Sequence, residues 1–262
     1  GLTEARGRNP SDSFWTWRKT MYEFLDAMQP HHLLAIASQL YLKLLSAGYT
    51  RVAEFQYLHH QQHGSRYDDP AEMSLHTLQA ARHVGIGITN LPVHYQFGGF
   101  GEQAISAQQT RFYNKPEDLL RIVESLVEHC KDDVNANVGV AGHSLRATSK
   151  QAFGEVLTGL EGMQGLIGQS APIHIHIAEQ VKEIEDCLKW SGARPVDYCL
   201  DSFDVNSRWC LVHATHMSEG ETMSLANRGA VAGLCPTTEG NLGDGFFNAT
   251  KSASFSLEKS LR

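Results

Sequence analysis

The feature that most constrains the fold is a regular alternation of helix and strand signals along the chain. Segments with apolar residues at helical spacing are followed by short runs that are rich in β-branched and aromatic residues. The expected helices span residues 30–48, 69–85, 116–130, 149–160, 181–190 and 218–229. The expected strands span residues 49–57, 86–95, 138–147, 171–178, 209–216 and 230–235. Strands separated by helices predict a parallel α/β sheet with right-handed crossovers.

The length of the chain fits one domain of this class. A chain of 262 residues, 42% of them hydrophobic, can bury a large core, and a single α/β barrel of this size is ordinary. We therefore expect one barrel domain over residues 1–262.

Charge and hydropathy exclude several kinds of partner. The formal charge is -7, the isoelectric point is near 6.0 and no basic cluster is present, which argues against nucleic acid and membrane surfaces. No apolar run approaches the roughly 20 residues that span a bilayer. The sequence favours a soluble, cytoplasmic protein with a small-molecule substrate. The five scattered cysteines suggest reduced thiols that fill the core.

Polar residues follow the expected strands at the points where the strands end. In parallel α/β folds these carboxyl ends form one rim, where ligands bind. Glu239, beyond the last strand, is a further candidate for this rim. The other expected rim residues are Tyr57, His143, Arg146, His176, Glu179 and His213.

The segment HIHIAEQ, residues 174–180, carries the most specific chemistry. Side chains alternate across a strand, so His174 and His176 share one face and the isoleucines occupy the other. A neutral imidazole at the strand end suits a zinc ion, and Glu179 could take a proton from an activated water. A single strand histidine is usually structural, but Glu179 and the second strand ending at His213 favour a ligand role for His176. We expect His174 to be a packed or supporting residue.

Six motifs occur in order along the chain: DSFWTWRKTMY, GYTRVAEFQYLHH, HSLRA, HIHIAEQ, CLVHATH and GAVAGLCPTTEGNLGDG. Together they resemble the formimidoylglutamate deiminases of the amidohydrolase superfamily. The resemblance runs from about Asn9 to about Thr250. It implies a (β/α)8 barrel of the TIM type with a small β-sandwich, one catalytic Zn²⁺ per subunit and a homodimer. It also implies hydrolysis of N-formimidoyl-L-glutamate to N-formyl-L-glutamate and ammonia during histidine degradation.

The resemblance also implies a role for each rim residue. His176 matches the zinc ligand of the fifth strand, Glu179 the general acid and base, and His213 the histidine that orients the attacking water. The substrate-binding positions of the family are matched by Arg18, Tyr57, His143 and Arg146. Guanidinium groups suit the two carboxylates of a glutamate derivative.

Two family motifs have no counterpart in this sequence. The first-strand HxH pair would precede residue 9, and the eighth-strand aspartate would follow residue 247, where the segment 248–262 does not resemble the family. The sequence therefore predicts the central part of a deiminase barrel, without strands 1 and 8 and without the β-sandwich.

Several readings stay open. Arg18, which follows Trp15 and Trp17, could be a surface residue beside packed aromatics. We expect His59, His60 and His63 to lie in an exposed loop and residues 98–103 to form a mobile loop. Residues 237–245 could form an anion-binding backbone or a plain turn. The rival functions are another amidohydrolase deaminase, acting on a purine or pyrimidine, and a catalytically incomplete fragment.

Overall fold

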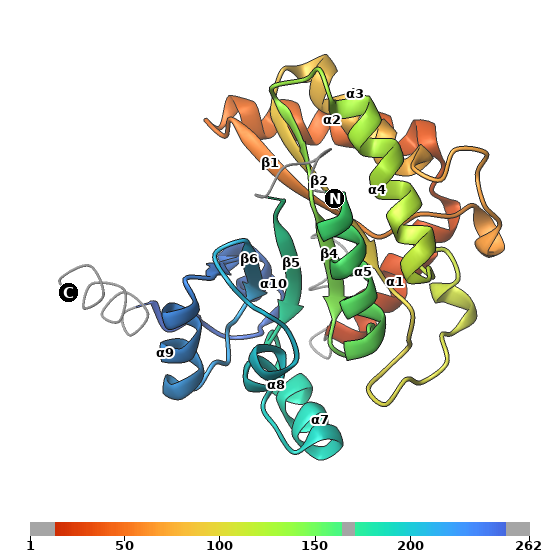
Figure 1. The fold of residues 1–262 in the computed structure, drawn as a ribbon. Helices are drawn as coiled ribbons and strands as arrows, with labels where there is room; N and C mark the ends of the chain where they lie inside the picture. The colour runs from red at the N-terminus through yellow and green to blue at the C-terminus, as the bar shows by residue number, and fades with distance from the viewer. Residues whose placement is uncertain (1–13, 164–170, 250–262) are drawn as a thin grey trace. The chain divides into compact units, whose positions relative to one another are not determined.

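Strands alternate with helices in the structure, as the sequence predicts. A computed structural model describes residues 14–163 and 171–249 (Figure 1). The described residues form two compact units: the N-terminal unit, residues 24–163 and 171–173, and the C-terminal unit, residues 174–249 together with 14–23. Helix α1 (Phe14–Ala27) comes first along the chain.

The N-terminal unit is built on parallel strands. Strand β2 pairs in parallel with β1, β3 and β4, and its register with β1 runs from Arg51 opposite Gly87 to Gln56 opposite Pro92. Helices α3 and α4 pack on β2, and α5 packs on α4 (Figure 1). The elements are α2 (Pro30–Ser46), β1 (Arg51–Gln56), η2 (Gln62–Gly64), α3 (Glu72–Val84), β2 (Gly87–His94), η3 (Ala107–Gln109), α4 (Pro116–Cys130), β3 (Ala136–Val138), β4 (Val140–Ser144) and α5 (Lys150–Gly162).

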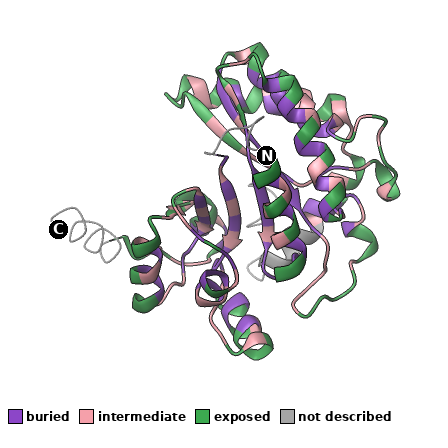
Figure 2. Cartoon of the chain, viewed as in Figure 1, coloured by how far each residue is buried: buried purple, intermediate pink, exposed green. Residues whose placement is uncertain are grey.

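Local sequence signals explain where these helices begin and end. Helix α4 starts at Pro116, whose missing N–H costs nothing in the first turn, and two acidic residues follow it near the positive end of the helix dipole. Helix α3 ends at Gly85, which adopts a left-handed conformation with φ of 82°. The apolar stripe of α4 is buried and its other face is exposed (Figure 2). The stripe covers the sheet, as expected for an amphipathic helix.

The core of this unit lies where β2 and β4 meet. Leu91, Val93 and Ala141 are fully buried, and Phe55 and Tyr57 pack against them. Tyr57 therefore packs on buried apolar side chains of β2 and β4.

The C-terminal unit continues the same alternation. The strand order is β5, β6, β7, and β6 pairs with β7 in parallel. Helices α8 and α9 are tied together by Glu221, a fully buried residue that accepts hydrogen bonds from Arg194 Nε at 2.7 Å and from the Val196 N–H at 3.2 Å. The elements are β5 (Ile173–Ile177), α7 (Val181–Ser191), α8 (Pro195–Ser202), β6 (Trp209–His213), α9 (Glu219–Arg228), β7 (Val231–Gly233) and α10 (Pro236–Leu242).

The predicted fold class is confirmed, and the differences lie in the short elements. Each of the six expected strands is present, and β3 is an additional three-residue strand. The expectation of a turn or an anion-binding backbone at 237–245 is wrong for most of that segment, which forms helix α10. Proline at the first helical position and Gly243 in the left-handed conformation after the last one account for this short helix.

Within residues 14–163 and 171–249, no helix combines the length and the apolar character that crossing a bilayer requires.

Candidate active site

Strand β5 presents two histidines from its polar face. Ile173, Ile175 and Ile177 are buried, whereas His174 and His176 are half-buried, so the alternation expected from the sequence is confirmed. Burial lowers the pKa of His174 to about 4, which keeps its imidazole neutral at physiological pH. His176, one residue from the strand end, faces the same side.

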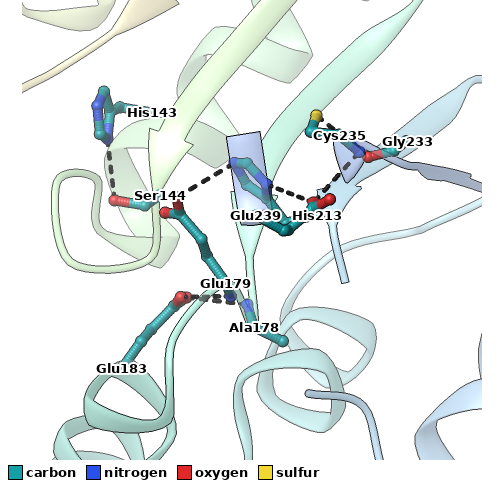
Figure 3. Close-up of polar contacts among 9 residues, drawn as sticks. All are labelled: His143, Ser144, Ala178, Glu179, Glu183, His213, Gly233, Cys235 and Glu239. Atoms are coloured by element: carbon teal, nitrogen blue, oxygen red, sulfur yellow. Dashed lines mark hydrogen bonds and ion pairs between the residues drawn. The ribbon is translucent and has the colours of Figure 1, made fainter. Parts of the chain in front are cut away.

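The chain turns sharply after β5 and places Glu179 against His213. Glu179 is 6% exposed, and its Oε1 lies 3.5 Å from Nε2 of His213, the last residue of β6 (Figure 3). The ring centroids of His176 and His213 are 5.3 Å apart. The three residues for which the sequence predicts a role in the reaction, His176, Glu179 and His213, are therefore neighbours in the C-terminal unit.

His213 is held between two carboxylates. Its Nδ1 lies 3.0 Å from Oε1 of Glu239, and the same oxygen accepts a hydrogen bond from the Cys235 N–H at 3.2 Å. Burial alone would lower the pKa of His213. A hydrogen bond with the Cys235 side chain, the charge of Glu179 and the hydrogen bond with Glu239 outweigh burial and raise this pKa to about 9. With a carboxylate at each ring nitrogen, the imidazolium can donate to both.

The backbone at the end of β6 is unusual. His213 and the following Ala214 have φ values of 71° and 51°, a left-handed region that non-glycine residues seldom occupy. The Ala214 N–H donates to the Ile177 carbonyl and the His216 N–H to the Ala178 carbonyl, both at 3.0 Å. These bonds join the ends of β5 and β6 and hold the His213 side chain at the edge of the sheet.

The C-terminal unit offers two candidate sets of metal ligands: the single residue His176, and a group of three residues. His176 offers a half-buried imidazole at a strand end, the donor type that catalytic zinc sites use. His213, Cys235 and Glu239 also present ligand atoms that all lie within 4.8 Å of one another. In the second set, the hydrogen bond between His213 and Glu239 already joins two of the three groups.

Two of the predicted substrate-binding residues meet in the N-terminal unit. The rings of Tyr57, which follows β1, and His143, on β4, are perpendicular with centroids 5.4 Å apart. Tyr95 and Phe112 complete this aromatic group, with Tyr95 4.7 Å from His143 and Phe112 5.0 Å from Tyr57. His143 Nδ1 lies 3.1 Å from the hydroxyl of Ser144 (Figure 3).

Of the two predicted substrate-binding arginines, the structure describes the side chain of Arg146 but not that of Arg18. Arg146 is half-buried in the turn after β4, where the Ala147 and Thr148 N–H groups both donate to the Ser144 carbonyl. Arg18 belongs to helix α1, and its side chain lies outside the described residues.

One sequence expectation about histidines is wrong. His59 does not lie in an exposed loop: it is 2% exposed, and its Nε2 lies 2.9 Å from the Val93 carbonyl. His60 is half-buried against the Tyr113 carbonyl, and only His63 is exposed. The local sequence gave no sign that β2 would cover this loop.

Some residues of the site were not predicted from the sequence. Cys235 and Glu183 were not candidates, although Glu183 sits in the first turn of α7, where a carboxylate often bonds to nearby N–H groups. That position is the signal that could have identified it.

Comparisons with known proteins place the chain in a family. The sequence profile of the amidohydrolase family matches residues 3–254. The formimidoylglutamate deiminase of Pseudomonas aeruginosa is 48% identical over 250 residues, which are 95% of this chain and 53% of that protein. A 5-methylthioadenosine/S-adenosylhomocysteine deaminase of Nitratidesulfovibrio vulgaris is 33% identical over 148 residues, 56% of this chain and 32% of that protein.

Solved structures show the same likeness. The crystal structure of an amidohydrolase from Brucella melitensis has a TM-score of 0.90 and 49% identity, over 97% of this chain and 55% of that chain. A zinc-bound adenosine deaminase from Xanthomonas campestris shares the fold, with a TM-score of 0.75 at 19% identity, over 97% of this chain and 51% of that chain. The chain spans about half the length of the deiminase and of the two solved structures. Its resemblance to the formimidoylglutamate deiminases is confirmed, and the chain belongs to the amidohydrolase family.

Proposed function

We propose that the protein carrying this chain hydrolyses N-formimidoyl-L-glutamate to N-formyl-L-glutamate and ammonia, a reaction of histidine degradation. The observation that carries the proposal is the pairing of Glu179 with His213 Nε2 beside His176, in a chain 48% identical to a formimidoylglutamate deiminase. The amidohydrolase family and the deiminase relative support a hydrolytic deaminase in general terms. The substrate is the finer part of the proposal.

The formimidoyl carbon bears two nitrogens, so its hydrolysis needs an activated water, a proton for the departing ammonia and stabilisation of charge at a tetrahedral carbon. When bound, zinc would acidify a water molecule and polarise the reacting group. His176 would be one of the residues that hold it.

Glu179 is the residue that moves the proton. Its carboxylate is buried and lies at the end of β5, where it can accept a proton from water and return it to the leaving nitrogen. The ring of His213 orients the water. The contact between its Nδ1 and Glu239 holds the ring in one orientation during the reaction. The acceptor and the orienting donor thus come from adjacent strand ends.

Recognition of the glutamate part requires cations for two carboxylates. Arg146 is half-buried, and no carboxylate among the described residues forms an ion pair with it. We assign one carboxylate to Arg146 and the other to Arg18, with Tyr57 and His143 as polar contacts to the substrate. A planar guanidinium can bind each carboxylate through two parallel hydrogen bonds.

The test is ammonia release from N-formimidoyl-L-glutamate by the purified full-length protein that carries this chain. Arg146→Met should lower kcat/KM by about 10- to 150-fold, because a hydrogen bond between charged groups is worth roughly 1.5 to 3 kcal/mol. Arg18→Met should act in the same direction. The matched control is Arg121→Met, since Arg121 is an exposed residue of α4 whose guanidinium lies 3.4 Å from Asp118.

A deaminase that acts on a purine would give the opposite result in this assay. Turnover of 5-methylthioadenosine with no release of ammonia from N-formimidoyl-L-glutamate would overturn the proposed substrate. Equal kcat/KM for wild type and both arginine variants would point to a substrate without carboxylates.

A further inference from the structure

The turn that carries Glu179 contains backbone strain. Strand β5 ends at Ile177, and Ala178 adopts a φ of 51° before the chain reaches Gln180, the N-cap of α7. A left-handed conformation costs a residue with a Cβ about 1 to 2 kcal/mol, so other contacts must hold it. Ala178 is fully buried, which leaves no water to satisfy its N–H.

Glu183 satisfies this turn. One of its oxygens accepts the Ala178 N–H at 3.1 Å and the other accepts the Glu179 N–H at 2.9 Å (Figure 3). In an ordinary capping box, the third residue of the helix bonds back to the N-cap residue. Here Glu183 is that third residue, but it reaches past Gln180 to the two residues before it. Two successive N–H groups make a small anion-binding concavity, and the Glu183 carboxylate fills it.

The turn is also fixed from the β6 side. The Ala178 carbonyl accepts the His216 N–H at 3.0 Å, and the Ile177 carbonyl accepts the Ala214 N–H at the same distance. The backbone leading to Glu179 is therefore held at its carbonyls by β6 and at its N–H groups by Glu183. The Glu179 side chain extends from this fixed backbone, and its Oε1 lies 3.5 Å from Nε2 of His213.

We propose that Glu183 is a positioning residue that sets the place of the Glu179 carboxylate by holding the N–H groups of Ala178 and Glu179. The inference rests on the proposed function insofar as Glu179 moves the proton. A proton acceptor misplaced by about 1 Å can cost on the order of 100-fold in rate. The conformation of this turn therefore affects the rate through the position of the Glu179 carboxylate.

The first variant is Glu183→Gln. Glutamine has one carbonyl oxygen, and its NH₂ group would face the second N–H, so one of the two hydrogen bonds is lost. In the zinc-loaded full-length protein, kcat for ammonia release should fall about 10- to 100-fold, while KM changes by less than about twofold. Zinc content should stay as in the wild type. Glu185→Gln is the matched control, because Glu185 is an exposed residue of the same helix.

A second variant separates positioning from folding. Ala178→Gly removes the strain of the left-handed conformation, so Ala178→Gly/Glu183→Gln should recover thermal stability. If Glu183 positions Glu179, kcat stays low in this double variant. If Glu183 only stabilises the turn, kcat returns together with Tm, and the proposal is overturned. Should Glu183→Gln alone be unfolded at the assay temperature, the double variant takes its place in the comparison.

Hydrogen exchange gives a readout that does not depend on activity. The Ala178 and Glu179 amides should exchange faster in Glu183→Gln than in wild type and in Glu185→Gln. Unchanged exchange, or faster exchange with kcat within twofold of the wild type, contradicts the proposal. A wild-type protein that releases no ammonia would contradict the proposed function instead, and exchange would still report whether Glu183 holds the turn.

Discussion

Three glutamates of the C-terminal unit are buried and accept backbone N–H groups from the turns that precede their helices. Glu183 binds the turn before α7, Glu221 accepts the Ser218 N–H before α9, and Glu239 accepts the Cys235 N–H before α10. Their exposed fractions are 5%, 0% and 4%. Glutamate is rarely buried, and burial is tolerated here because each carboxylate has its hydrogen bonds supplied.

The most direct residue test of the reaction is Glu179→Gln. The amide is nearly the same size but cannot accept and return a proton, so kcat should fall by about 10²- to 10⁴-fold. Zinc content should not change, because we assign the metal to His176 and not to Glu179. Elemental analysis and the ammonia assay measure the two effects separately. Near-normal kcat would rule out the proposed role.

A second residue test concerns pH and the buried His59. Burial lowers the pKa of His59 to about 3, despite its hydrogen bond to Val93, and His60 and His94 add repulsion. In the unfolded chain this pKa is about 6.5, so below that pH the unfolded state binds a proton that the folded state does not. The free energy of unfolding therefore falls as the pH drops from about 6.5 towards 3.

The magnitude follows from the size of one pKa unit. Between pH 7.5 and 5.5, His59 alone should remove about 1.4 kcal/mol of stability. His59→Gln keeps a donor for the Val93 carbonyl. Over the same pH interval, its free energy of unfolding should fall by about 1.4 kcal/mol less than that of the wild type. Urea unfolding at the two pH values checks this, with exposed His63→Gln as the control. If the free energy of unfolding depends on pH equally in His59→Gln and in the wild type, His59 is not held in its neutral form in the folded protein.

At the scale of elements, the strands could be predicted better than short helices and the burial of loop residues. The alternation of isoleucine and histidine in β5 determines which face each side chain takes, so the grouping of His176 with residues at the next strand end followed from the sequence. Helix α10 could not be predicted in this way, because Gly240 within it and Gly243 and Gly245 after it resemble a turn. The burial of His59 could not be predicted, since it depends on Val93, which is remote in the sequence, whereas the first-turn position of Glu183 was a usable signal.

Gly139, between β3 and β4, shows how closely these elements approach. A Cβ at this position would lie 2.3 Å from the Pro172 carbonyl oxygen and 2.9 Å from Leu91 Cδ2. Gly139→Ala should destabilise the protein by about 1 to 3 kcal/mol, the usual cost of overpacking. The control is Gly154→Ala in α5, where nothing lies within 4 Å and alanine should be neutral or stabilising by up to about 1 kcal/mol. Equal melting temperatures for the two variants would contradict the close approach.

At the scale of the whole molecule, the family could be recognised because its motifs sit at successive strand ends. His176, Glu179 and His213 come from β5 and β6, and Tyr57 and His143 from β1 and β4. Within each unit, polar residues at the ends of neighbouring parallel strands lie close together, so a few short motifs are enough to indicate the chemistry. The helices between them carry packing information, which is shared by many unrelated proteins.

The last prediction concerns zinc binding by the 262-residue chain. A catalytic zinc usually takes three protein ligands besides water, and among the described residues the family resemblance assigns only His176 to this role. The chain spans 53% of the Pseudomonas aeruginosa deiminase. We expect the chain alone to bind zinc weakly and to release no ammonia. The same chain joined to the flanking segments of that deiminase should bind one zinc ion and turn over.

Elemental analysis after dialysis, with the ammonia assay, compares the two proteins. Tight zinc binding by the chain alone would contradict this expectation and direct attention to His213, Cys235 and Glu239, whose ligand atoms lie within 4.8 Å of one another. Cys235→Ser then distinguishes the sites, because it removes the thiolate from that cluster and leaves His176 intact. Loss of zinc in Cys235→Ser would place the metal in the cluster, where it would compete with the hydrogen bond between His213 and Glu239. Retention of zinc would place it at His176, with its remaining ligands supplied from within these 262 residues.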